Sequence, residues 1–248
     1  MSKVCLVIPV YNENRTLHRT IVELMEGSRD YKLLFVDDGS NDGSTKTLTR
    51  LHSKYQFDTV THDQNLGYGS ACRSGADWAI SKGYEWIVFA DSDLTNPLNE
   101  IVDLVKRIQN VDFDVYKANR VASSTSMSFN SSYRKFLSLL AKRFTKFFVG
   151  PSIKDPTNGF RAIRSDFYKQ FRLHSCDFSL IMEEVYEYIR LEARICNFEA
   201  RLGTRSLEQK ESSFRYNKQL IQRYVYWCFR CLLRRIFRLF TLLKARLS

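Results

Sequence analysis

Two aspartates, separated by one residue, follow the apolar run at residues 86–90, and the stretch reads Asp91-Ser92-Asp93. If that run is a strand, residues two apart project to the same side, so both carboxylates face one point. Two like charges held together favour a bound cation. Oxygen ligands suit Mg²⁺ or Mn²⁺, which complete their coordination with phosphate oxygens and water. The alternative is a solvated Asp-x-Asp turn, because short motifs also occur by chance.

The elements that must position these aspartates alternate along the first half of the chain. Apolar runs predict strands at 4–9, 33–36, 59–62 and 86–90. Helical patterns between and after them predict helices from Asn14 to about residue 25, at 45–55, from after residue 70 to Trp78, and at 99–109. Strands alternating with helices indicate an α/β fold with a mostly parallel sheet and right-handed crossovers.

Ligands bind such sheets outside the carboxyl ends of the strands. The residues expected at those ends include Pro9, Tyr11 and Glu13, then Asp37 and Asp38, and then Asp91 and Asp93. They predict a single cleft with an acidic floor. The first strand is not followed by Gly-x-Gly-x-x-Gly, and the chain has no Gly-x-x-x-x-Gly-Lys-Ser/Thr, which argues against an ordinary dinucleotide fold and excludes a P-loop.

The second half is expected to complete the domain. A fifth strand is predicted at 113–117, with Arg120 after it, and the turn from Asp155 to Arg161 leads into a short strand at 162–163. Helices follow from Asp166 and around Glu183 and Glu184. The segment 123–132 is serine-rich and is expected to be a loop.

Composition limits the partners. The chain has 248 residues and a formal net charge of +11, which indicates a polyanionic partner. Its N-terminus shows no signal peptide and its six cysteines are scattered, so reduced thiols and a cytoplasmic location are expected. Cys228-x-x-Cys231 lacks a second ligand pair, so it is interpreted as two residues on one helix face rather than a zinc site. No apolar run is long enough to span a bilayer.

Two segments are basic and amphipathic: 131–149, and 215–248, where no acidic residue follows Glu211. In the second, Arg230, Arg234 and Arg238 recur every four residues and so share a helix face. We interpret this helix as lying in a membrane interface. An RNA-binding helix and an oligomer contact are the alternatives; no nucleic-acid recognition fold accompanies it.

Taken in order, the motifs resemble family-2 glycosyltransferases of the GT-A fold, most closely dolichol-phosphate mannose synthase and the bacterial polyprenyl-phosphate hexosyltransferases. The motifs that carry the resemblance are 9–13, 37–40, 65–67, 91–93 and 155–161. The resemblance covers residues 3 to about 214, so residues 1–214 are expected to form the catalytic domain and 215–248 a helical tail.

The resemblance implies roles for individual residues. The nucleotide sugar would contact Pro9, Tyr11, Glu13, Val36, Asp38, Asp91, Ser92, Asp93 and Arg120, and a Mg²⁺ or Mn²⁺ ion would bind Asp91 and Asp93. Thr95 stands where the family often has Gln. The acceptor phosphate would lie near Arg134, Asp155, Asn158, Arg205 and Ser213, and catalysis would depend on Asp93, Arg120 and Arg205. The family's late Arg-to-Lys pattern is altered between Arg205 and Ser213, which puts closure of that loop in question.

The implied reaction is inverting transfer of a hexose from a GDP- or UDP-linked donor. A polyprenyl phosphate acceptor is already anionic and needs no general base, whereas a saccharide or protein hydroxyl would require one, with Glu183 or Asp155 as candidates. An inactive membrane-binding scaffold is the third hypothesis. The enzyme is expected to be peripheral on the cytoplasmic face of a membrane and to have no nucleic-acid partner, and a homo-oligomer is an alternative to a monomer.

Overall fold

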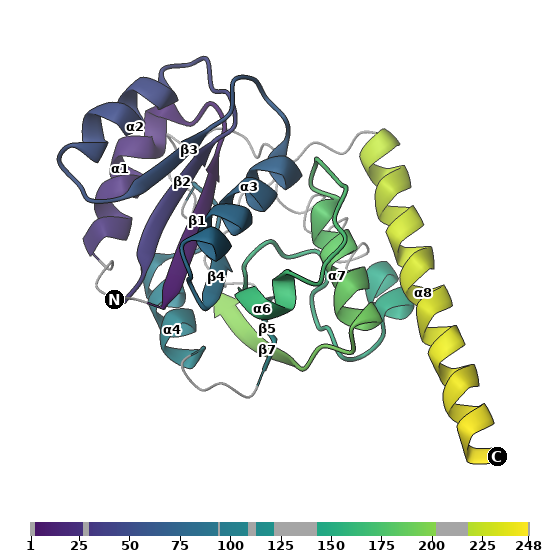
Figure 1. Cartoon of the computed structure of the whole chain (residues 1–248). Helices are drawn as coiled ribbons and strands as arrows, with labels where there is room; N and C mark the ends of the chain where they lie inside the picture. Colours follow the sequence, from purple (N-terminus) through teal and green to yellow (C-terminus); the bar gives the residue numbers. More distant parts are fainter. Residues whose placement is uncertain are drawn as a thin grey trace.

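The computed structural model describes residues 3–26, 30–93, 95–108, 113–121, 143–201 and 218–247. Its centre is a seven-stranded sheet in the order β3-β2-β1-β4-β6-β5-β7 (Figure 1). The strands are β1 (Val4–Val10), β2 (Lys32–Asp37), β3 (Asp58–Thr61), β4 (Trp86–Phe89), β5 (Val115–Val121), β6 (Arg161–Arg164) and β7 (Ile195–Arg201).

The parallel half of the sheet confirms the prediction. β1 pairs in parallel with β2 and β4, and β2 pairs in parallel with β3. The second half differs, because β6 is antiparallel to both of its neighbours, β4 and β5. β7, which pairs in parallel with β5, was not predicted. Since β6 reverses direction between them, β4 and β5 still end at the same edge of the sheet.

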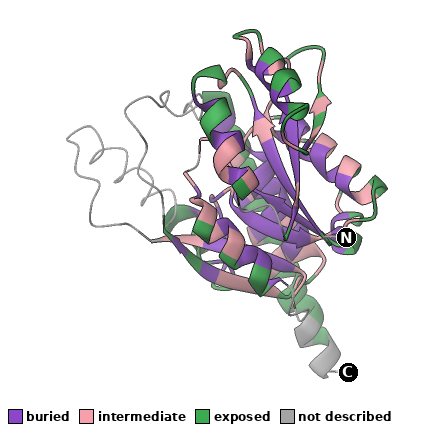
Figure 2. Ribbon diagram, turned by 90° about the vertical axis from the view of Figure 1, so that its left-hand side faces the viewer, coloured by how far each residue is buried: buried purple, intermediate pink, exposed green. Residues whose placement is uncertain are grey.

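Helices cover both faces of the sheet. On one face α1 (Asn14–Glu26), α2 (Ser44–His52) and α4 (Leu98–Arg107) contribute to one buried apolar cluster. On the other face α3 (Tyr68–Ser81), α6 (Ser165–Tyr168) and α7 (Leu180–Arg190) contribute to a second cluster. Figure 2 shows the buried strands between helices whose outer sides are exposed. The amphipathic patterns that predicted these helices therefore each bury their apolar stripe on the sheet.

The last helix, α8 (Lys218–Leu247), packs along α7 and extends beyond the body of the molecule at its C-terminal end (Figure 1). Its contact face buries Leu220, Cys228 and Cys231, so the two cysteines are the helix-face residues that the sequence predicts. No helix among the described residues combines the length and hydrophobicity needed to cross a bilayer.

Several predictions fall outside the described residues. These are the roles of Arg134, Arg205 and Ser213, the serine-rich loop, the domain boundary at 214, and the part of the 131–149 helix that precedes residue 143. Residues 143–149 of that segment are helical.

Candidate active site

The loops after β1 and β2 are joined by hydrogen bonds from main chain to side chain. The Asn12 amide donates to the Ser40 hydroxyl at 2.9 Å, and the Asn41 amide donates to Asn12 Oδ1 at 2.8 Å. The Glu13 amide donates to Ser44 Oγ at 2.9 Å. Asn12 adopts a left-handed backbone conformation with φ 55°, which asparagine tolerates better than most residues. The small polar residues after β2 therefore fix the loop that carries Tyr11 and Glu13.

Asp38 organises a third loop. It is only 3% exposed, and it accepts hydrogen bonds from the amides of Leu66 (2.9 Å) and Gly67 (2.8 Å). His62 Nδ1 lies 2.7 Å from Asp38 Oδ1, and His62 Nε2 lies 2.9 Å from Ser74 Oγ. Asp38 thus positions residues 65–67, which we call the glycine loop, and the contact of Asp38 with a nucleoside stays a prediction.

The other residues predicted to hold the nucleoside divide into two groups. Pro9 and Glu13 are partly exposed and Tyr11 is 37% exposed, so all three present surface at the end of β1. The Val36 side chain has no exposed surface and belongs to the apolar cluster beneath α3, and its contact with the nucleoside stays a prediction. The Val36 side chain therefore contributes to the core, not to the open edge.

The two aspartates after β4 lie where the sequence places them. Asp91 and Asp93 are both partly exposed, and the intervening Ser92 is buried. The Ser92 carbonyl accepts a hydrogen bond of 2.8 Å from the buried Thr20 hydroxyl on α1. Thr95 donates to Asp93 Oδ1 from its amide at 2.9 Å and also from its hydroxyl. Thr95 thus holds Asp93 in place.

These two carboxylates fit a divalent cation that takes its remaining ligands from elsewhere. Among the described ranges no group of three or more His, Cys, Asp or Glu side chains is arranged to enclose a metal ion. Mg²⁺ is typically held by one or two carboxylates together with substrate phosphates and water. The donor set of Asp91 and Asp93 matches that chemistry and not a closed protein site.

The segment 155–161 reaches this edge at Gly159. A Cβ on Gly159 would lie 3.2 Å from the Tyr68 hydroxyl and 3.8 Å from Asp91 Oδ1, so the three groups are neighbours. Burial, with smaller contributions from Cys72 and Asp91, raises the pKa of Tyr68 well above its ordinary value. The Tyr68 hydroxyl therefore stays protonated beside the aspartate.

Arg120 lies at the same edge, within β5 and not after it as predicted. Its guanidinium donates to both oxygens of Asp155, at 2.9 and 3.0 Å, and to Thr157 Oγ1 at 2.7 Å. Asp155 is completely buried, while the Arg120 side chain is 29% exposed. Adjacent strands lie about 4.8 Å apart, so the ends of β4 and β5 are roughly 10 Å from each other. Asp155 and Thr157 therefore fix the orientation of the Arg120 guanidinium near the end of β5.

Asn158 stabilises the conformation of the segment 155–161. Its amide nitrogen donates to the Ala118 carbonyl at 3.2 Å, and its oxygen accepts from the Phe160 amide at 3.1 Å. Its carbonyl accepts a hydrogen bond from the amine of Lys117, which is fully buried on β5. Asn158 is itself buried, so it shapes the segment and presents little surface to an acceptor.

Lys117 should make stability depend on pH. Burial, assisted by repulsion from Arg161, lowers its pKa to about 7, whereas an unfolded lysine titrates near 10.5. Between these values the unfolded chain binds a proton that the folded chain does not, so stability rises with pH by about 1 kcal/mol per pH unit. Lys117→Met should lose that slope in urea unfolding at pH 7, 8 and 9, and the exposed Lys46→Met should keep it. Equal slopes in all three proteins would contradict a neutral buried amine.

Neither candidate general base is available to a substrate. Glu183 is completely buried and accepts hydrogen bonds from the amides of His174 (2.8 Å) and Ser175 (2.7 Å). Asp155 is buried and paired with Arg120 through both oxygens. Both carboxylates therefore hold structure.

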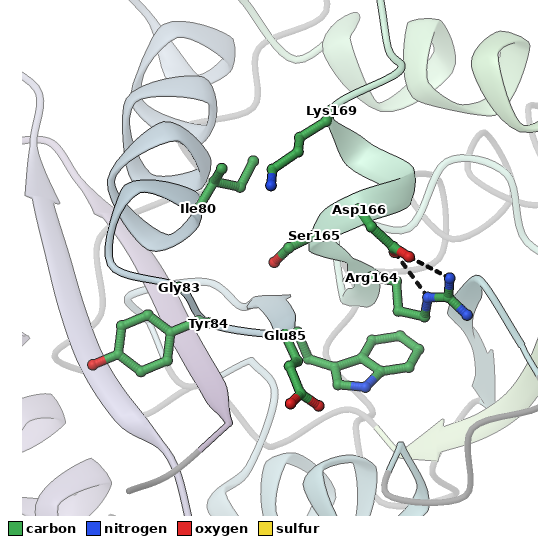
Figure 3. Close-up of a pocket in the computed structure, with 9 residues that line it drawn as sticks. Ile80, Gly83, Tyr84, Glu85, Arg164, Ser165, Asp166 and Lys169 are labelled. Atoms are coloured by element: carbon green, nitrogen blue, oxygen red, sulfur yellow. Dashed lines mark hydrogen bonds and ion pairs between the residues drawn. The ribbon is translucent and has the colours of Figure 1, made fainter.

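A separate cavity of about 330 Å³ lies at the opposite edge, where β4 begins. Figure 3 shows the side chains of Ser165, Lys169 and Ile80 directed into it, beside the Arg164–Asp166 ion pair. It contains none of the predicted site residues, so the acidic edge remains the candidate site.

Comparison with known proteins shows the family of this chain. Residues 5–172, more than half of the chain, match the description "Glycosyl transferase family 2". The chain belongs to this family. It is therefore a glycosyltransferase, as the resemblance implies.

The relatives with assigned activities include lipid-phosphate sugar transferases. The chain is 27% identical over 207 residues to the undecaprenyl-phosphate mannosyltransferase of Micrococcus luteus, covering 83% of this chain and 81% of the relative. It is 25% identical over 178 residues to the polyprenol monophosphomannose synthase of Mycolicibacterium smegmatis, covering 71% and 67% respectively.

Among solved structures, glucosyl-3-phosphoglycerate synthase of Mycobacterium tuberculosis, in complex with Mn²⁺, uridine diphosphate and glucosyl-3-phosphoglycerate, matches with a TM-score of 0.61. The alignment covers 93% of this chain and 79% of the other at 19% identity, so it shows a common fold. The predicted GT-A fold is thereby confirmed.

Proposed function

We propose that this glycosyltransferase moves a hexose, with inversion, from a GDP- or UDP-linked donor to a polyprenyl phosphate, and that it works on the cytoplasmic face of a membrane. The proposal is supported by the two lipid-phosphate relatives and by the arrangement of the acidic edge. Asp91 and Asp93 would hold a Mg²⁺ or Mn²⁺ ion, which would stabilise negative charge on the departing nucleoside diphosphate.

The observation that carries the choice of acceptor is the burial of both candidate bases. A hydroxyl acceptor must lose a proton as it attacks the sugar, and Glu183 and Asp155 are buried with both carboxylate oxygens hydrogen-bonded to the protein. A phosphate acceptor attacks as an oxyanion and needs no base. Its oxygen bonds to the anomeric carbon from the face opposite the diphosphate while the bond to the diphosphate oxygen breaks. Arg120, held by Asp155, would offset the repulsion between the two phosphate groups.

The second support is an apolar outer face on α8. Its exposed members are Tyr226, Phe229, Leu233, Ile236, Phe237 and Phe240, and they lie on the side opposite the buried Cys228 and Cys231. Two exposed phenylalanines of the helical segment 143–149, Phe144 and Phe147, extend this surface, and Phe148 contacts Phe229 at a ring-centroid distance of 5.1 Å. Aromatic and aliphatic side chains in this arrangement are suited to a bilayer interface.

The arginine row on α8 has a different orientation from the one expected for lipid binding. Arg230 donates to the Tyr186 hydroxyl at 3.1 Å and Arg238 pairs with Glu192 at 2.9 Å. Arg234 donates to the Arg190 carbonyl at 3.4 Å. The three arginines therefore attach α8 to α7 and the turn after it, and the apolar outer face is left to contact lipid.

This orientation predicts membrane binding driven mainly by apolar insertion. The wild-type chain should co-sediment with vesicles of phosphatidylcholine and phosphatidylglycerol and keep much of that binding at high salt. Phe237→Glu/Phe240→Glu should bind about a hundredfold more weakly, because two large apolar side chains no longer leave water. Gln56→Glu/Ser81→Glu, which adds the same charge on exposed residues elsewhere, should bind like wild type. Undiminished binding by the phenylalanine variant would remove the outer face from the proposal.

The reaction is tested by incubating radiolabelled GDP- and UDP-hexoses with the full chain, Mg²⁺ or Mn²⁺, and either undecaprenyl or dolichyl phosphate. We expect label to enter the organic phase only with lipid phosphate and metal present. Transfer to a soluble saccharide without lipid would instead support the hydroxyl-acceptor hypothesis. The absence of transfer to any acceptor would support the inactive scaffold.

A further inference from the structure

A short loop, residues 175–178, connects α8 to the candidate site, and we call it the bridging loop. On one side the first turns of α8 hold it. Tyr224 donates from its hydroxyl to the Phe178 carbonyl at 3.1 Å, and Trp227 donates from Nε1 to Ser175 Oγ at 3.3 Å. Arg223 forms an ion pair with Asp177. Three α8 side chains thus contact successive parts of the bridging loop.

On its other side the bridging loop contacts the start of α3. The Cys176 carbonyl accepts hydrogen bonds from the amides of Gly69 (2.7 Å) and Ser70 (3.3 Å), which are unpaired within the helix because they belong to its first turn. The Phe178 ring stacks on Tyr68, with centroids 4.5 Å apart and an interplanar angle of 15°. Tyr68 is the residue whose hydroxyl lies beside Gly159 and Asp91.

The bridging loop packs tightly against the glycine loop and the start of α3. A Cβ on Gly67 would come within 2.4 Å of the Cys176 carbonyl oxygen, and a Cβ on Gly69 within 2.4 Å of the Ser175 carbonyl oxygen. Gly67 also has φ +94°, a conformation that favours glycine. The Gly67 amide in turn donates to Asp38. A displacement of the bridging loop must therefore displace the glycine loop, Tyr68, or both.

We propose that Tyr224 and Trp227 of α8 are positioning residues for the donor site, and that they act through the bridging loop on Tyr68 and the glycine loop. The proposal rests on the proposed function, because it takes the edge formed by Asp38, Asp91 and Asp93 as the place where a metal–nucleotide binds. It differs from the expectation that residues 215–248 form a helical tail outside the catalytic domain. The outer face of α8 would contact the membrane, and side chains of its first turns would position the donor site.

The test compares variants that lose one hydrogen bond each. Tyr224→Phe and Trp227→Phe keep an aromatic ring but remove a donor to the bridging loop. Tyr186→Phe is the matched control, because it removes the hydroxyl that accepts from Arg230 and so loosens α8 without touching the bridging loop. For each full-length protein, UDP and GDP are titrated calorimetrically in the presence of Mn²⁺, and the thermal unfolding midpoint and vesicle co-sedimentation are measured in parallel.

We expect Tyr224→Phe and Trp227→Phe to weaken Mn²⁺–nucleotide binding about three- to tenfold, as for loss of one hydrogen bond that orders a binding loop, with vesicle binding unchanged. Tyr186→Phe should bind the nucleotide like wild type even if its unfolding midpoint falls equally. If all three variants bind like wild type, or all weaken in proportion to their unfolding midpoints, α8 has no specific link to the site and the inference is overturned. If the wild-type chain itself binds neither nucleotide, it is the proposed function that fails.

Discussion

Replacing Asp91 or Asp93 with asparagine is expected to lower kcat/KM for sugar transfer by about three orders of magnitude or more. Asparagine keeps the shape of the side chain and removes the charge that would bind the cation. Both residues are partly exposed at the end of β4, so neither substitution leaves an uncompensated buried charge. The loss should appear in turnover and in Mn²⁺–nucleotide titrations, while the thermal unfolding midpoint stays close to that of wild type.

The control for this prediction is Asp103→Asn, an exposed carboxylate on α4 that should leave turnover unchanged. A second comparison is Thr95→Val, which removes the hydroxyl that holds Asp93 and should cost less than either aspartate. Retention of wild-type kcat/KM by both aspartate variants would show that the metal–diphosphate site is elsewhere.

Convergence of the acidic residues could be predicted from sequence because it depends on one rule of parallel sheets. Once the runs at 4–9, 33–36 and 86–90 are assigned as parallel strands, Glu13, Asp38 and Asp91 must lie at one edge. The same rule does not say which side chains turn inward. Asp38 and Val36 are both within or next to β2, and both proved to be buried.

The features that the sequence did not predict depend on contacts between residues far apart in the chain. β6 is only four residues long and polar at both ends, and nothing local fixes its antiparallel direction. β7 contains Asn197 and Glu199 and lacks a clear apolar run. α8 carries apolar residues on two opposite sides, so its sequence predicts a helix but does not show which of the two sides packs against α7. Thr20 and Tyr68 belong to none of the motifs that predicted the site. Only the fold places Thr20 beside Ser92 and Tyr68 near Asp91.

The second large effect is expected at a buried ion pair beneath the site. Arg161 and Glu184 are both completely buried, and the Arg161 guanidinium donates to Glu184 Oε1 at 2.5 Å and to the Gly159 carbonyl at 2.6 Å. Its Cζ also lies 4.0 Å from the centroid of the Phe89 ring. Since Gly159 adjoins Asp91, this pair supports one side of the candidate site from within the core.

Arg161→Met is expected to lower the free energy of unfolding by about 3–5 kcal/mol, because it leaves the Glu184 carboxylate buried without its cation. Arg161→Met/Glu184→Leu should be markedly more stable than the single variant, since no uncompensated charge remains. Urea unfolding at neutral pH measures both. The double variant should nevertheless bind Mn²⁺–nucleotide more weakly than wild type, because the Gly159 carbonyl has lost its donor. A single variant as stable as wild type would contradict the burial of this pair. A double variant with wild-type affinity would show that Arg161 supports the fold without shaping the candidate site.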